Sequence, residues 1–391
     1  MEFKEDESSK KTCSKKAIIV LIIFVFFIIA SIVVIVVLVK KTRNDLGEYY
    51  LSEKICETES SGKKVCFRKI NINAEHYIQE KSENVKRTHV RYDNRYGINL
   101  AADLYTPKNL DKKKKYRGLV IGPPYGGVKE QSPSIYANYF AQQDFVVVAF
   151  DPSFNGESGG KNRKVSSSDI FVEDFSASVD YLGTLEYVDR ENIGAIGICG
   201  SGGFLLAAAA IDKRIKTIIT VVMYDIPGMN NITNKTEWQS RIEELKDRRW
   251  KDVDKGEQQY DIYYRPDRVY VDETIPSEFP ELDYWKNFYS TERGHHARAT
   301  GGFTFISNFS LINLQVTNNI ENIAPRKILF VYCKDNNTKS YEFNIKAINQ
   351  FKDANNTISK LVENANHLDL YDNTEKIPFD YINEFLLENL V

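Results

Sequence analysis

A short glycine-rich segment contains the residues best suited to covalent chemistry. Residues 193–204 are Ile-Gly-Ala-Ile-Gly-Ile-Cys-Gly-Ser-Gly-Gly-Phe, followed by an alanine-rich stretch, which predicts a buried strand that turns sharply into a helix. Such a turn holds its central side chain in a strained, exposed position and requires small residues around it. Cys199 meets this requirement with Gly197 before it and Ser201 after it, and Ser201 meets it with Cys199 before it and Gly203 after it. The segment lacks the lysine of a phosphate-binding loop, so it predicts a nucleophile at Cys199 or Ser201.

A nucleophile of this kind needs a base that takes its proton. The chain has five histidines. His76 and His89 precede or open the predicted sheet, and His295 and His296 lie in a region without strands. His367 follows the last clear strand and stands just before the closing helix, in the order nucleophile, acid, histidine. We therefore predict that His367 is the base.

The acid that orients the base should follow the strand that precedes the histidine. Residues 327–332 predict this strand and run almost directly into Asp335. Asp369 and Asp372 are too close in sequence to His367 to be the first choice. Asp335 is therefore the predicted acid, and a turn-forming aspartate is the alternative interpretation.

Backbone N–H groups should stabilise the negative charge that develops during attack on a carbonyl. One is expected from Gly200, directly after Cys199, and the other from the loop 122–127. That loop begins Gly-Pro-Pro, and proline has no N–H, so Tyr125 is its first possible donor. This loop and the loop 151–159 should also shape the substrate pocket. The predicted substrate-binding residues are Gly126, Ser153 and Phe154.

The elements that position these residues alternate along the chain. Short apolar runs predict strands at residues 88–92, 98–105, 117–122, 145–150, 193–197, 216–223 and 327–332. The first two flank Asp93-Asn94 and predict an antiparallel hairpin. Amphipathic or alanine-rich stretches predict helices at residues 133–143, 169–185 and 203–211. Continuous apolar strands that alternate with helices predict an α/β fold with a mostly parallel sheet covered on both faces.

The stretch from about residue 225 to residue 324 breaks this alternation. It is charged and aromatic, predicts a helix at 237–251, and contains no clear strand. We interpret it as a helical cap inserted between two strands. His295 and His296, with Arg298, lie within it; adjacent histidines point in different directions, so we expect a structural or pocket-lining role and no metal site.

Four separated motifs together resemble the dienelactone-hydrolase-like branch of the α/β-hydrolase superfamily. They are residues 122–131, 151–160, 197–203 and 366–372, and they occur in the expected order between about His89 and the C-terminus. The resemblance implies an eight-stranded sheet, a triad with a cysteine or serine nucleophile, and neither a metal nor an organic cofactor. The family's thiol occupies the position of Cys199, although one extra residue separates Cys199 from the glycine pair. The cap and the apolar segment near the N-terminus are not typical of its soluble bacterial members.

That apolar segment predicts a transmembrane helix at residues 17–39. It contains about 23 residues, enough to cross a hydrocarbon core of about 30 Å, and it ends in Val-Lys-Lys without a cleavage site. Lysines are slightly more frequent on its N-terminal flank, which favours a cytoplasmic tail at residues 1–16 and a C-terminal body in a lumen or outside the cell. Residues 40–85 are expected to form a stalk and extension, and residues 86–391 the hydrolase domain.

Cysteine usage agrees with an oxidising compartment. Cys56 and Cys66 flank a polar turn and are compatible with a hairpin closed by a disulfide. A reactive Cys199 in such a compartment is exposed to oxidation unless the pocket protects it. Either Ser201 is the nucleophile, or the orientation of the chain in the membrane is opposite to that predicted, or a closed pocket protects Cys199 from oxidants.

The expected function follows from the ordered triad. The net charge of −2 and the absence of a basic stripe give no support for nucleic-acid binding, and a single predicted span argues against a carrier or channel. The leading hypothesis is a single-pass membrane hydrolase of an ester, thioester, lactone or acyl-peptide bond. An aminopeptidase or prolyl-peptidase activity on the same fold and a catalytically silent binding ectodomain are the alternatives. The sequence leaves the oligomeric state open.

Overall fold

The computed structural model describes residues 49–58, 62–230, 234–260, 267–271, 283–299, 302–313, 315–351 and 356–391. The predicted tail at 1–16, the predicted span at 17–39 and the start of the predicted stalk lie outside these residues. Within the described ranges, no helix has both the length and the apolar character needed to span a bilayer.

Two compact units divide the chain. One comprises residues 1–51 with 71–75, and the other comprises residues 52–70 with 76–391. In the first, the N–H of Asn71 donates to the carbonyl of Tyr49 at 2.8 Å. The second contains the sheets, the helices and the predicted site.

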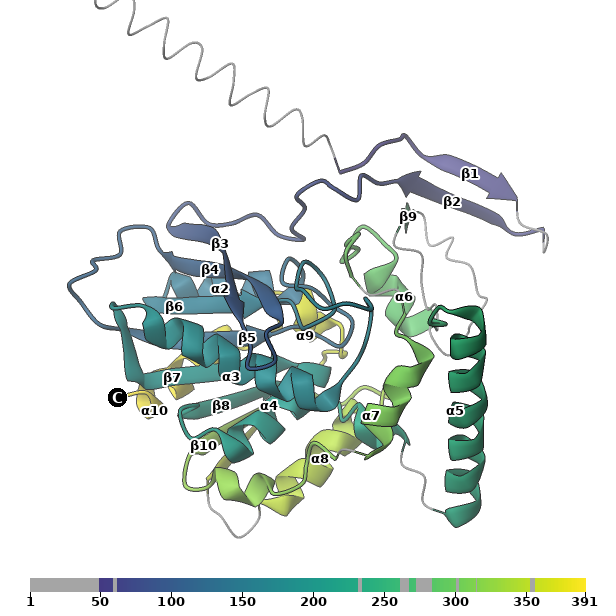
Figure 1. Ribbon diagram of the computed structural model, residues 1–391. Helices are drawn as coiled ribbons and strands as arrows, with labels where there is room; N and C mark the ends of the chain where they lie inside the picture. Colours follow the sequence, from purple (N-terminus) through teal and green to yellow (C-terminus); the bar gives the residue numbers. More distant parts are fainter. Residues whose placement is uncertain are drawn as a thin grey trace, which may run out of the picture. The chain divides into compact units, whose positions relative to one another are not determined.

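An eight-stranded sheet forms the centre of the second unit (Figure 1). Its order is β11-β10-β8-β7-β5-β6-β4-β3. The strands are β3 (Val85–Asp93), β4 (Asn99–Pro107), β5 (Tyr116–Gly122), β6 (Phe145–Phe150), β7 (Val188–Ile198), β8 (Thr217–Val221), β10 (Lys327–Cys333) and β11 (Thr357–Val362). β4 runs antiparallel to β3 and β6, and the other neighbours are parallel. The prediction of a mostly parallel eight-stranded sheet is therefore confirmed.

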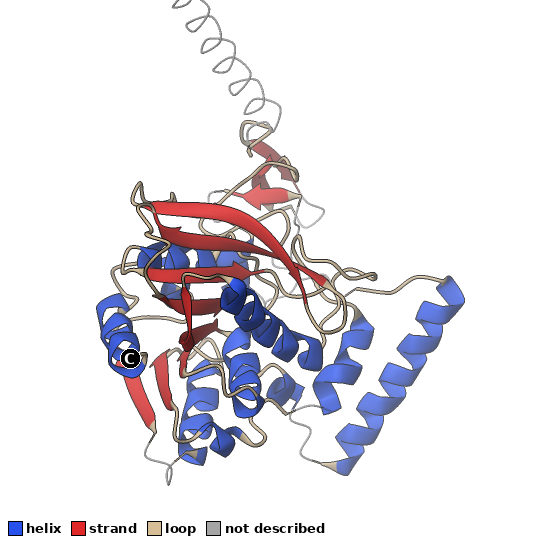
Figure 2. Cartoon of the chain, turned by 60° about the vertical axis from the view of Figure 1, so that its left-hand side comes forward, coloured by secondary structure: helices blue, strands red, loops and turns tan. Residues whose placement is uncertain are grey.

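Helices lie on both sides of this sheet (Figure 2). They include α2 (Ser132–Ala141), α3 (Ser168–Thr184), α4 (Gly200–Ile211), α8 (Ser340–Gln350) and α10 (Phe379–Asn389). Every residue of β6 and β8 is buried, as expected for strands covered on both faces. Each valine buried in β6 contributes about 1.5–3 kcal/mol through removal of apolar surface from water. This packing makes the carboxyl ends of the parallel strands a rigid platform.

In its described residues, the segment between β8 and β10 contains mostly helices. Its elements are η1 (Pro227–Asn230), α5 (Lys235–Lys255), β9 (Arg268–Tyr270), α6 (Asp283–Tyr289), η3 (Phe305–Ser307), α7 (Asn308–Asn313) and η4 (Ile320–Ile323). The expectation that this segment contains no strand is wrong at β9. β9 has three residues and pairs with β2, about 200 residues earlier, so no local periodicity could have indicated it.

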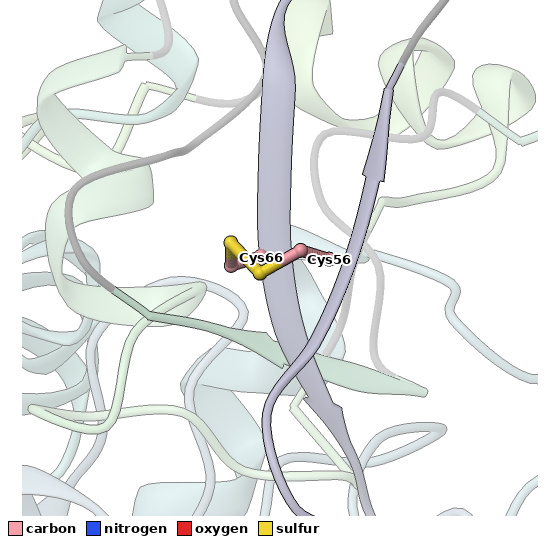
Figure 3. Close-up of a disulfide and its surroundings, with 2 residues drawn as sticks. All are labelled: Cys56 and Cys66. Carbon is pink, nitrogen blue, oxygen red and sulfur yellow. A yellow bond between two sulfur atoms is a disulfide. The ribbon is translucent and has the colours of Figure 1, made fainter.

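A small second sheet has the order β1-β2-β9. β1 (Ile55–Thr58) and β2 (Lys64–Lys69) are antiparallel, with Cys56 directly opposite Cys66. These two cysteines form a disulfide (Figure 3). The hairpin closed by a disulfide is therefore confirmed.

Candidate active site

The turn between β7 and α4 places Cys199 in a conformation that few side chains adopt. Its φ is +55° and its ψ is −120°, the strained geometry expected of a nucleophile at a strand-to-helix turn. The N–H of Cys199 donates to the carbonyl of Val221 at 2.8 Å, which holds the turn against β8. Gly197 has to be glycine, because a Cβ there would lie 2.4 Å from the carbonyl oxygen of Ser201. The small residues predicted around the turn are thus required by the close approach of backbones.

Ser201, the alternative nucleophile, has a different position. It lies in the first turn of α4, and its hydroxyl donates to the carbonyl of Pro123 at 2.5 Å. Cys199, two residues earlier, has the positive φ. Of the two candidates, the geometry favours Cys199.

Two backbone N–H groups and one hydroxyl surround the sulfur of Cys199. The N–H groups of Tyr125 and Gly200 and the hydroxyl of Tyr371 interact with the thiol. A Cβ at Gly200 would lie 2.8 Å from the Cβ of Tyr125, so the two predicted oxyanion donors are close together. Burial raises the pKa of the Cys199 thiol to about 11, although the interactions with these three groups oppose this shift. The thiol is therefore protonated at neutral pH.

His367 lies between β11 and α9 (Asp369–Asp372), enclosed by aromatic rings. Its ring centroid lies 5.1 Å from that of Trp285 and 6.0 Å from that of Tyr224. Its Nε2 lies 3.2 Å from the hydroxyl oxygen of Tyr371. Burial lowers the pKa of His367 to about 3, and the charge of Asp335 only partly opposes this. The imidazole is therefore neutral and able to accept a proton.

Asp335 follows β10, as predicted, and is buried next to His367. Its Oδ2 accepts the backbone N–H of His367 at 2.8 Å and the hydroxyl of Tyr284 at 2.6 Å. Its Oδ1 accepts the backbone N–H and the side-chain amide of Asn337, both at 2.9 Å. Burial would raise the pKa of Asp335, but these hydrogen bonds, that from His367 foremost, bring it below its ordinary value. Asp335 is thus a carboxylate that holds the backbone of the histidine loop.

The three predicted triad residues therefore gather at one site, but their contacts differ from a simple chain of hydrogen bonds. The Tyr371 hydroxyl contacts both the sulfur of Cys199 and Nε2 of His367. Nδ1 of His367 is buried and has no hydrogen-bond partner within the described part of the chain. Asp335 contacts the backbone of His367 and acts on the ring through its charge.

A small apolar cavity lies beside the turn. Its volume is about 10 Å³, room for roughly one water molecule, and neither Cys199 nor His367 lines it. Its lining residues are Pro123, Pro124, Tyr125, Gly126, Gly127, Phe150, Pro152, Asn155, Phe171, Phe175, Ser201, Phe204 and Phe303. The structure thus brings Tyr125 and Gly126 to this cavity as expected.

Ser153 and Phe154 do not line the cavity, although their neighbours Pro152 and Asn155 do. The hydroxyl of Ser153 donates to the buried carboxylate of Asp174 at 2.7 Å. Phe154 has a φ of +68° and lies against Gly160, where a Cβ would be 2.3 Å from its ring. Their side chains therefore stabilise the 151–160 loop, and their role in substrate binding stays a prediction.

Buried charges hold the two loops beside the cavity. The carboxylate of Asp151 accepts the backbone N–H groups of Lys129 and Glu157, each at 2.8 Å. The ammonium of Lys129 lies 2.6 Å from Glu157. Arg298, from the segment between β8 and β10, pairs with Glu130 at 2.5 Å. This network fixes the loop that supplies the Tyr125 N–H.

His295 and His296 are both buried, and neither lines the cavity. Burial lowers the pKa of His296 to about 3. Across the described residues, no cluster of three or more His, Cys, Asp or Glu side chains is arranged to hold a metal ion. The two histidines contribute to the packing of this part of the protein.

Three aromatic residues of the site were not predicted from the sequence. Tyr284 and Trp285 belong to α6, the helix labelled in Figure 1. From the segment between β8 and β10, Tyr284 contacts Asp335 and Trp285 contacts His367. No local pattern could have indicated them, because they are about 50 and 80 residues from their partners. Tyr371 stands four residues after His367, in α9, and the turn between them brings its hydroxyl to the imidazole.

Known proteins with similar sequences and structures agree with this fold. Residues 132–271 match the model of the prolyl oligopeptidase family. The uncharacterized protein PA2218 of Pseudomonas aeruginosa is 40% identical over 318 residues, which cover 79% of this chain and 82% of that protein. The crystal structure of PA2218 has a TM-score of 0.73 and 38% identity, and the match covers 80% of this chain and 97% of that one.

Two fungal proteins extend the comparison. The crystal structure of the α/β hydrolase GrgF from Penicillium sp. sh18 has a TM-score of 0.62 and 18% identity, with 78% of this chain and 99% of that chain covered, a likeness of fold. A thiohydrolase of Eupenicillium brefeldianum is 36% identical over 103 residues, 26% of this chain and 33% of that protein. The chain belongs to the α/β-hydrolase superfamily, in one family with PA2218, and the prediction that it is a hydrolase is confirmed. Its likeness to dienelactone hydrolases in particular stays a prediction.

Proposed function

We propose that this protein is a membrane-anchored hydrolase that cleaves an acyl bond, with Cys199 as nucleophile, His367 as base and Asp335 as the acid that holds the histidine loop. One observation carries the proposal. Cys199 stands at a positive-φ turn with its sulfur beside the N–H groups of Tyr125 and Gly200. This is the arrangement that attack on a carbonyl carbon and stabilisation of the resulting oxyanion require.

The reaction follows from these positions. The sulfur of Cys199 attacks the acyl carbon and loses its proton toward His367, and the carbonyl oxygen becomes an oxyanion that Tyr125 and Gly200 stabilise. His367 then donates the proton to the leaving group, and an acyl-thioester remains on Cys199. Water, deprotonated by His367, attacks this thioester and releases the carboxylic acid, which regenerates the thiol.

The proposed substrates are ester, thioester, lactone or acyl-peptide bonds in molecules with a compact apolar acyl group. The apolar lining of the cavity, with Phe171, Phe175, Phe204 and Phe303, favours such a group. The similarity to a thiohydrolase favours the thioester among these bonds. We propose that residues 225–324 act as the cap that moves to admit it, because Tyr284 and Trp285 cover Asp335 and His367 from this segment.

The anchor and the compartment are part of the same proposal. The apolar run at residues 17–39 would span the membrane once, with the hydrolase domain in a lumen or outside the cell. The Cys56–Cys66 disulfide favours an oxidising compartment. A protonated thiol at Cys199 is compatible with it, because the thiolate is the form that oxidises.

A peptidase activity is the second candidate. The match of residues 132–271 to the prolyl oligopeptidase family favours it. It predicts release of an N-terminal amino acid or dipeptide from peptide amides by the same Cys199. A catalytically silent binding ectodomain predicts no covalent labelling at all.

Covalent labelling of the full-length protein separates these candidates. The protein is treated with p-nitrophenyl acetate, with a proline-containing peptide amide, or with a fluorophosphonate. The modified peptide is mapped by mass spectrometry in wild type, Cys199→Ala, Ser201→Ala and His367→Ala. Acetylation that disappears in Cys199→Ala and in His367→Ala supports the proposal. Loss of acetylation in Ser201→Ala but not in Cys199→Ala would identify Ser201 as the nucleophile. Labelling at neither residue supports the silent ectodomain.

A further inference from the structure

The hydroxyl of Tyr371 stands between the proposed nucleophile and the proposed base. Its oxygen lies 3.2 Å from Nε2 of His367, and it shares a hydrogen bond with the thiol of Cys199. His367 and Tyr371 are four residues apart, with ring centroids at 5.3 Å. The hydroxyl of Tyr371 therefore has the thiol as one polar partner and the imidazole as the other.

Packing holds the hydroxyl in this position. The Tyr371 side chain is fully buried and meets Phe288 edge-on, with ring centroids 5.2 Å apart and planes at 86°. Tyr289 adds a side-chain hydrogen bond and a second edge contact at 6.5 Å. Both residues belong to α6, so this helix clamps Tyr371 against the site. A ring confined in this way keeps its oxygen beside both partners.

We propose that Tyr371 is a catalytic residue that relays the proton from Cys199 to His367. This inference rests on the proposed function of the site. As the bond between sulfur and the acyl carbon forms, the S–H bond breaks and its proton passes to the oxygen of Tyr371. The original hydroxyl proton of Tyr371 passes at the same time to Nε2 of His367. Tyr371 is neutral before and after the step, and His367 later delivers the proton to the leaving group.

The hydrogen-bond capacities of the three groups agree with this direction. A hydroxyl can accept one hydrogen bond while it donates another, so the relay requires the thiol to donate to Tyr371 and Tyr371 to donate to Nε2. Nε2 is then an acceptor, and the imidazole proton is on Nδ1. Burial raises the pKa of the Tyr371 hydroxyl well above its ordinary value, so it does not act as a tyrosinate base. It can release a proton only while it receives one.

The test measures acylation of the full-length protein by p-nitrophenyl acetate in the pre-steady state. Tyr371→Phe keeps the ring and removes the oxygen, and we expect its acylation rate to fall by about 10²-fold or more with a small change in KM. In wild type, the rate measured in mixtures of H₂O and D₂O should curve downward from a straight line, because two protons move in the same step. Tyr92→Phe is the matched control, because it also removes a tyrosine hydroxyl. Tyr92 lies in β3, its hydroxyl is bonded to Ser178 of α3 at 2.7 Å, and the variant should be acylated at the wild-type rate.

The outcomes are distinct. Tyr371→Phe that acylates at the wild-type rate, or faster, overturns the relay, as does a linear dependence of the wild-type rate on deuterium content. The isotope measurement needs no variant and decides the question if Tyr371→Phe does not fold. Wild type that forms no acetyl-Cys199 overturns the proposed function and the relay with it, whereas failure of the relay alone leaves an active wild type.

Discussion

The pH dependence of Cys199 alkylation tests the electrostatics of the site. Burial raises the pKa of this thiol to about 11 and lowers the pKa of His367 to about 3. A gap of about eight pKa units leaves the proton on sulfur, and the resting site contains a neutral thiol and a neutral imidazole. A thiolate–imidazolium pair would require these two pKa values in the opposite order.

The expected rates follow from the thiolate fraction. With a pKa of about 11, about one thiol in 10³ is ionised at pH 8 and about one in ten at pH 10, so alkylation should accelerate about 100-fold over this range. An ordinary cysteine, with a pKa near 8.5, would level off above about pH 9.5. A thiolate–imidazolium pair would react at a nearly constant rate from about pH 5 upward.

The assay uses short exposures of the full-length protein to iodoacetamide between pH 6 and pH 10.5. Digestion and mass spectrometry then quantify the Cys199 and Cys333 peptides separately. Cys333 is an internal control, because burial raises the pKa of its thiol to about 12 and it should react more slowly still. The unfolded protein supplies the rate of an ordinary thiol. A plateau below pH 8 at Cys199, or a rate at pH 7 above that of the unfolded protein, would refute the reasoning.

Three further changes have defined outcomes. Asp335→Asn places an amide where Oδ2 of Asp335 accepts the N–H of His367 and the hydroxyl of Tyr284. We expect the rate of acylation by p-nitrophenyl acetate to fall about 10²-fold or more. A fall of less than about threefold would contradict the role of Asp335 as the acid of the triad. The pKa of His367 is about 3 in the folded protein and near 6.5 in the unfolded protein, so between these values the unfolded state binds more protons and the free energy of unfolding decreases as the pH falls. The melting temperature of His367→Gln should therefore fall less than that of wild type between pH 7 and pH 4. An equal fall in both proteins would count against a buried neutral imidazole. Ser201→Ala removes the hydroxyl that donates to the carbonyl of Pro123, and this should lower the free energy of unfolding, measured in urea, by about 1–2 kcal/mol. The rate of acylation should stay at the wild-type value. Loss of acylation would instead assign the nucleophile to Ser201.

Much of the fold could be predicted because its signals are local. Apolar runs such as residues 145–150 have the composition of a buried parallel strand, and the structure places β6 there. Glycines around Cys199 indicated the sharp turn, since only a missing Cβ lets backbones pass at that distance. The three-residue strand β9 was missed because its pairing with β2 is a long-range contact and its own residues carry no periodicity.

The candidate site was predictable in its chain order and less so in its contacts. Cys199, Asp335 and His367 each follow a strand whose carboxyl end faces the same edge of the sheet, so their proximity follows from the topology. Which atom of His367 meets Asp335 depends on the conformation of the 363–368 loop, and it is the backbone N–H. Ser153 was expected at the substrate, but its hydroxyl is bonded to Asp174 from α3, a partner that local sequence does not reveal.

By itself, the sequence determined the alternation of strands and helices, the turn at Cys199, and the candidate base and acid, because each depends on residues that are near in the chain or on the order of strands. The spacing of Cys56 and Cys66 was compatible with a disulfide, and the structure contains it. Only the tertiary structure decided that Tyr371 contacts both Cys199 and His367, that Tyr284 and Trp285 reach the site from a distant segment, and that the neighbouring cavity is as small as about 10 Å³. These features depend on the packing of side chains from separate segments, which the folded chain brings together and no local pattern records.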